Sequence, residues 1–219
     1  MRDNPVHTVL QFLVGGIPDQ LTVAKSMPLV AVLLVTLYWS ALVGGIVVAV
    51  LNWRRDPAQR TAHAIGVFVL RMTMAGMWWL GILWKLPLPV SDGFKYWLGQ
   101  TVKGSALTVH ADIMQVFLGH IAIAQPLVFL LELSIGISLM MGFLVRASGT
   151  LAALFTLNLL IGLYNVGGEW PWTYVGIIVA HGMFALEHSG RFLGLDNLLR
   201  LTTWGRGRSF LPRAFRTLS

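Results

Sequence analysis

The chain has 219 residues and a formal net charge of +7, yet only 11% of its residues are charged and 56% are hydrophobic. A soluble domain carries about 25% charged residues, so this composition, with a mean hydropathy of +0.71, excludes a soluble globular domain, a disordered chain and an ordinary nucleic-acid binder. The absence of cysteine excludes disulfides, thiolate metal sites and cysteine nucleophiles. Long uncharged apolar stretches predict a polytopic α-helical membrane protein.

Five stretches are long enough to cross a bilayer at about 1.5 Å per residue. In chain order they are residues 28–51, 62–86, 116–141, 147–166 and 172–188. We therefore expect an all-α fold, in which a four-helix bundle is preceded by one extra transmembrane helix. The predicted parts are an N-terminal segment, the extra helix, the four-helix domain and a basic tail, at residues 1–27, 28–51, 62–199 and 200–219.

Basic residues gather on one side of the predicted membrane. The segment 52–60, the turn at Arg146 and the tail after Gly190 hold 10 of the 16 Lys and Arg residues. The positive-inside rule then places the N-terminus outside and the Arg-rich tail in the cytoplasm. The membrane that we expect is a bacterial or archaeal plasma membrane. Membrane lipids are the expected partner of the tail, rather than nucleic acid, since anionic headgroups attract about 1 kcal/mol per basic residue.

The outer loop at residues 91–112 predicts an amphipathic helix. Phe94, Trp97, Leu98 and Val102 recur there at helical spacing. We expect this helix to lie on the outer leaflet or over the bundle.

Polar residues recur seven positions apart in four of the five spans, which places each set on one helix face. We expect spans two to five to form a bundle with a polar interior and the first span to pack outside it. The sets are Arg71, Trp78 and Lys85; Gln125 and Glu132; Asn158 and Asn165; and Tyr174, His181 and His188.

Arg71 and Glu132 lie well inside their spans, where one charge costs roughly 2.5–3.5 kcal/mol or more. Counting from the cytoplasmic ends puts both in the inner half of the bundle, which predicts that they form a structural ion pair. Such a pair could be a clamp for assembly or a proton or ligand site, and the sequence leaves both open.

A candidate quinone or substrate site lies in the outer half of the predicted bundle. A quinone headgroup needs hydrogen-bond donors at its carbonyl oxygens and a flat apolar wall, which His181 with Lys85 and Trp78 or Trp79 could supply. His181 could also pass protons near neutral pH. The alternative is that each polar group bonds to a neighbouring helix and the space is filled. The candidate residues are Trp78, Lys85, Asn158, Tyr174 and His181.

His120 and His181 raise the question of b-type haem, since two histidines on different helices could ligate it. Their predicted depths differ by about two turns of helix, so no haem or metal is expected. A histidine that packs in the core or bonds a quinone is expected instead.

Several short motifs stand between Ala62 and Leu199. They are Arg71-Met-Thr-Met-Ala-Gly76, Gly81-Ile-Leu-Trp-Lys85-Leu86, Glu132-Leu-Ser-Ile-Gly136, Gly142-Phe-Leu-Val-Arg146, Gly168-Glu169-Trp-Pro-Trp-Thr-Tyr174, Gly190-Arg191 and Gly194-Leu195-Asp196. The first four resemble two consecutive helices of DoxX-like membrane proteins. The others look like the branch that contains DoxD, the small subunit of thiosulfate:quinone oxidoreductase. The resemblance implies a DoxX-like four-helix bundle, to which the first span and the tail are additions.

The resemblance also implies a function, as a membrane subunit of a quinone-linked redox complex that transfers electrons from a small sulfur anion such as thiosulfate. Quinone is the expected cofactor, and further subunits are the expected protein partners. The alternative is a non-enzymatic accessory or scaffold subunit, for which Ser40, Ala41, Gly44 and Gly45 of the first span offer a helix-packing surface. A transporter would be expected to show inverted repeats, which the sequence lacks. Whether the chain is itself an enzyme stays open.

Overall fold

The computed structural model describes residues 28–82, 85–86, 89–202, 207 and 209–219. This described part forms nine α-helices and two short 3-10 helices and contains no strand, so the expected all-α fold is confirmed. The predicted N-terminal segment, residues 1–27, lies outside the described residues.

Four helices of the described chain are long and apolar enough to cross a membrane, by their length and composition. They are α3 (Pro28–Arg55), α4 (Ala62–Ile82), α7 (Ile121–Met141) and α8 (Val145–Leu163). The helix α9 (Pro171–Leu186) is also apolar but has only 16 residues. The chain thus has the helices of a membrane protein, and the last of the five predicted spans is shorter than the usual ~20 residues.

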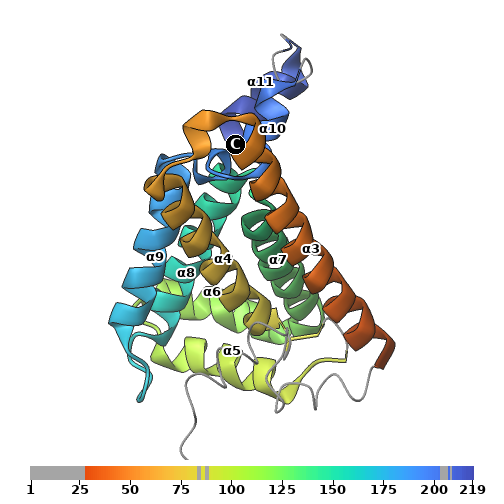
Figure 1. Ribbon diagram of the computed structural model, residues 1–219. Coiled ribbons are helices and arrows are strands. Elements are labelled where there is room, and N and C mark those ends of the chain that lie inside the picture. The colour runs from red at the N-terminus through yellow and green to blue at the C-terminus, as the bar shows by residue number, and fades with distance from the viewer. Residues whose placement is uncertain (1–27, 83–84, 87–88, 203–206, 208) are drawn as a thin grey trace, which may run out of the picture.

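The membrane helices are arranged as pairs. α4 packs along α7, α8 packs along α9, and α3 lies against α7 and α10 (Leu195–Leu201). Figure 1 shows the helices converging at the end that carries α10 and α11 (Phe210–Leu218), and spreading toward α5 (Asp92–Gly104). We refer to these two ends of the bundle as the Arg-rich end and the α5 end.

Small residues let α3 approach α7 closely. A Cβ atom on Gly45 would collide with the carbonyl oxygen of Met140, so only glycine permits this contact. A Cβ on Gly44 would also meet α7, at 3.0 Å, and Ala41 is buried while Ser40 is exposed. Most of the small-residue surface that the sequence offered to a partner subunit is therefore covered within the chain.

Glycines also fix the axial register between α4 and α7. A Cβ on Gly81 would lie 3.3 Å from Oε2 of Glu132, whereas one on Gly142 would lie 2.6 Å from Nη1 of Arg71. Gly142 ends α7 with a φ of +67°, a conformation that favours glycine. It follows that α4 ends beside the middle of α7 and begins well beyond the other end of α7.

The helix α4 ends at Ile82, although the second predicted span runs to residue 86. Gln125, fully buried on α7, holds the connection between α4 and α5. Its Nε2 donates to the carbonyl oxygens of Leu86 and Pro89, the latter at 3.2 Å, and its Oε1 accepts from the amide of Ser91 at 2.9 Å. One side chain thus connects α7 to the start of α5.

The helices α5 and α6 (Thr108–Gly119) lie across the end of the bundle opposite α10 (Figure 1). Phe94 and Thr101 of α5 are buried, while Tyr96 is 58% exposed, so the amphipathic helix expected in this loop is confirmed and lies over the bundle. α6 and α7 are separate helices that meet at His120, so the third span begins at residue 121 rather than 116.

Candidate functional site

A cavity of about 700 Å³ lies between α7 and α8, beneath α5 and α6. This volume falls within the ~300–1,000 Å³ of small-molecule sites. Leucine, methionine and aromatic side chains form most of its wall, and its polar lining residues are Lys85, Thr101, Asn158, Glu169 and Tyr174. Three of the five candidate residues, Lys85, Asn158 and Tyr174, thus line a single cavity.

The other two candidates, Trp78 and His181, do not line it. The indole N–H of Trp78 donates to Nε2 of His181 at 2.8 Å, and Nδ1 of His181 lies 2.8 Å from the carbonyl oxygen of Ile177. His181 is therefore a neutral imidazole that donates from Nδ1, with both ring nitrogens occupied. The Trp78 ring lies 5.9 Å from that of Phe155, a lining residue, so this pair stands behind the cavity wall and joins α4 to α9.

A buried ion pair links the cavity to the bundle interior. Nζ of Lys85 lies 2.5 Å from Oε1 of Glu132, whose side chain is only 2% exposed. Oε2 of Glu132 has no hydrogen-bond partner within the described chain, and it faces Gly81 of α4. Since Lys85 lines the cavity, the pair places a buried carboxylate directly behind a charged lining residue.

The predicted pairing of Arg71 with Glu132 is therefore wrong. Arg71 is fully buried near the Arg-rich end, where Nη1 donates to the carbonyl oxygens of Ser189 at 2.9 Å and Phe192 at 3.3 Å. It stands level with Gly142, about ten residues or about 15 Å along α7 from Glu132. The prediction assumed that α4 and α7 end level, whereas α4 is shifted toward the Arg-rich end.

Asp196 organises the Arg-rich end, and the sequence identified it only as part of a family motif. It is fully buried, and its carboxylate accepts from the amides of Leu144 at 2.8 Å and Val145 at 3.2 Å, at the start of α8. Burial raises the pKa of Asp196 to about 6, against the opposing effects of these two N–H groups and of Arg71. A Cβ on Gly190 would collide with this carboxylate.

Two buried amides at the same end were missed altogether. Nδ2 of Asn52 donates to the carbonyl oxygen of Gly194 at 2.9 Å, and Nδ2 of Asn197 donates to Oδ1 of Asn52 at 2.9 Å and to Oδ2 of Asp56 at 3.1 Å. These bonds join α3 to α10. Neither asparagine belongs to the polar sets or motifs identified in the sequence. The one signal was that Asn52 lies at the end of an apolar run.

Two further polar pairs stand at the cavity. The hydroxyl of Tyr174 donates to Oε2 of Glu169 at 2.6 Å, and Oδ1 of Asn158 hydrogen-bonds Nε2 of His110 at 3.0 Å. Neither Glu169 nor His110 was a candidate, because each lies outside the predicted spans. The cavity therefore combines apolar walls with three polar pairs.

The site contains no recognisable ligand set for a metal: in the residues described, no three or more His, Asp or Glu side chains gather in a group that could hold one. Comparison of the chain with protein-family models, with curated proteins and with solved structures finds no match. The chemistry open to the site is set by its geometry, an apolar cavity among apolar helices in which Lys85 lines the wall and Glu132 lies behind it.

Proposed function

We propose that the chain is a quinone-binding membrane subunit of a redox complex and that the cavity beneath α5 is its quinone site. The observation that carries this proposal is that Lys85 lines a large apolar cavity and is paired with the buried carboxylate of Glu132 behind it. Charges inside membrane helices are costly, and non-helical backbone such as that at Lys85 is tolerated there where it is buried or lines a cavity.

The lining residues fit a quinone. The Lys85 ammonium can donate to one ring carbonyl, the Asn158 amide or the Tyr174 hydroxyl can serve the other, and Trp97 or Phe155 can pack against the flat ring. A bound quinone supplies two-electron redox chemistry.

The Lys85–Glu132 pair can manage a proton beside such a ligand. Glu132 uses Oε1 for Lys85, and its Oε2 has no hydrogen-bond partner in the described part of the chain. The carboxylate can therefore hold a proton at Oε2 while it keeps its contact with Lys85. Lys85 in turn lies between this carboxylate and the cavity.

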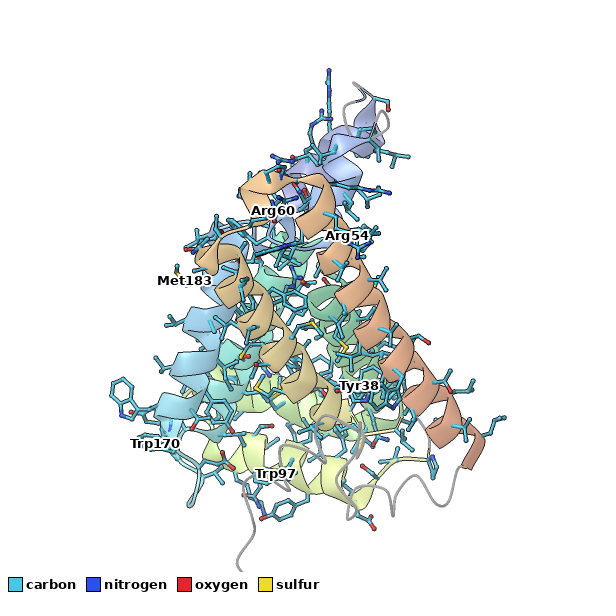
Figure 2. All side chains as sticks on the ribbon, viewed as in Figure 1. Tyr38, Arg54, Arg60, Trp97, Trp170 and Met183 are labelled. Carbon is cyan, nitrogen blue, oxygen red and sulfur yellow. The ribbon has the colours of Figure 1, made fainter. Side chains whose placement is uncertain are left out.

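The proposal includes a family and a topology. The motifs between Ala62 and Leu199 favour a DoxX-like protein of the DoxD branch, with α4, α7, α8 and α9 as the four-helix core and α3 as the addition. The short α9 serves as the fifth span, since Trp170 and Trp172 at its start are each 67% exposed, as interfacial tryptophans are. Figure 2 shows Trp170 pointing away from the bundle.

Purification of the full chain in mild detergent, followed by extraction and chromatography of bound quinone, tests the function. We expect quinone in the wild type and in Lys95→Met, which removes an exposed lysine of α5, and little in Lys85→Met. The double variant Lys85→Met with Glu132→Gln removes both buried charges and separates loss of binding from loss of folding.

A stable co-purifying protein partner without bound quinone would contradict the proposal and favour the accessory subunit. The small-residue surface that suggested that alternative is mostly occupied, because Ala41 of α3 is buried within the chain and Gly45 packs on the backbone of α7.

A further inference from the structure

We propose that the ligand reaches the cavity from within the bilayer, through an opening between α7 and α8, so that the site selects quinones with a long apolar tail. This inference rests on the proposed function of the cavity. It adds the route of access and the class of quinone, and it assigns a role to leucines that no catalytic argument uses.

Some leucines of α7 and α8 border both the cavity and the surface of the protein. Leu127 of α7 and Leu151 and Leu154 of α8 line the cavity, yet they are 56%, 50% and 58% exposed. A side chain that borders both a cavity and the protein surface marks an opening between them. Since α7 and α8 have the length and composition of membrane spans, this opening faces lipid acyl chains.

The packing of the helices explains why the opening exists. α7 and α8 are joined at the Arg-rich end by the short turn around Gly142, but farther along α7 packs on α4 and α8 packs on α9. The two helices therefore separate toward the α5 end.

Tight packing covers part of the α5 end of the cavity. A Cβ on Gly162 of α8 would lie 2.9 Å from Cβ of Thr101 on α5, and Phe94 and Met114 are each only 7% exposed. Trp97 of α5 and Phe117 of α6 also line the cavity and are 37% and 43% exposed, whereas the three leucines at the opening between α7 and α8 are at least 50% exposed. The side that faces the bilayer is therefore the more open one, and its border is apolar.

The polar lining residues complete a head-and-tail arrangement. Lys85 follows α4 and Tyr174 belongs to α9, so both stand on elements other than the two that form the opening. A ring bonded to these residues would direct its tail between the leucines, where tail and wall are both apolar.

Binding of two probes to the full chain in lipid nanodiscs tests this route. The probes are decylubiquinone and the same benzoquinone without its tail, each expressed as a mole fraction in the lipid so that partitioning is removed. The test variant is Leu127→Trp with Leu154→Trp, which narrows the opening. The control is Leu130→Trp with Leu157→Trp, on the same helices and 57% and 41% exposed, but outside the cavity lining.

We expect the test variant to lower the affinity for decylubiquinone about tenfold or more and to leave that of the tailless quinone within about twofold, while the control changes neither. Unchanged decylubiquinone binding in the test variant, or an equal loss of both probes, would overturn the lateral route while leaving the quinone site in place. Failure of the wild type to bind either probe would instead overturn the proposed function.

Discussion

Lys85 and Glu132 depend on each other, because either charge alone would be buried without compensation. Loss of one partner of a buried pair costs about 3–5 kcal/mol. We expect Lys85→Met to lower the yield of monodisperse protein in size-exclusion chromatography, and Lys85→Met with Glu132→Leu to restore part of it. The combination Arg71→Met with Glu132→Leu should give no such rescue, since these side chains have different partners. Rescue by that second combination would contradict the observed pairing.

Asp196 should make stability depend on pH in an unusual direction. Burial raises its pKa from 3.8 to about 6, so between these values the folded protein binds more protons than the unfolded chain. The contribution of Asp196 to the free energy of unfolding therefore falls by at most about 3 kcal/mol as pH rises through this window. Above the window it is constant. We expect Asp196→Asn to show a smaller loss of unfolding temperature than the wild type between about pH 4.5 and about pH 7. Parallel pH profiles would show that this carboxyl does not titrate in that range.

At the scale of elements, Gln125 is the joint between α7 and the start of α5. The change Gln125→Leu leaves the carbonyls of Leu86 and Pro89 and the amide of Ser91 without this partner, at about 1–3 kcal/mol for each group that stays buried and unsatisfied. We expect faster amide hydrogen exchange in α5, with little change where α8 packs on α9. Gln115→Leu, at an exposed position of α6, is the matched control. Equal exchange in both variants would contradict this role.

The sequence predicted the helices and their buried faces better than their relative positions. Apolar length identified the spanning helices, and the seven-residue spacing correctly placed Gln125 and Glu132 in the interior. Spacing determines which face of a helix is buried but not how far that helix is shifted along its neighbour. The predicted pairing of Arg71 with Glu132 was wrong for this reason. The end of α4 at Ile82 was also missed, because Leu83, Trp84 and Leu86 continue the apolar run and Pro87 lies beyond the predicted end.

The prediction of the candidate site was likewise right for some residues and not for others. Lys85, Asn158 and Tyr174 share a cavity, as neighbouring polar faces would suggest. His181 and Trp78 also lie on buried faces but bond each other, and no periodicity distinguishes a polar group aimed at a cavity from one aimed at another helix.

At the scale of the whole molecule, arginines from distant parts of the chain gather at one end. Arg54, in the last turn of α3, and Arg60, which follows it, both lie at the end that carries α10 (Figure 2). Arg146, in the first turn of α8, lies at the same end and bonds the carbonyl oxygen of Thr217 in α11. With the positive-inside rule, this end should face the cytoplasm. We expect a fluorescent protein fused after Ser219 to fluoresce in cells and an alkaline phosphatase fused there to be inactive. An active phosphatase would reverse the topology.

The convergence of the helices toward the Arg-rich end gives the described bundle the outline of a wedge (Figure 1). A wedge displaces more lipid from the leaflet at its broad end than from the leaflet at its narrow end. Lateral pressure in the broader leaflet would therefore act on α3 and α9 where they stand farthest apart, while the Arg-rich end is narrow and is held together by the buried bonds of Asn52 and Asp196. The lipid composition of that one leaflet sets its lateral pressure, and this pressure would act mainly on the half of the protein that encloses the cavity.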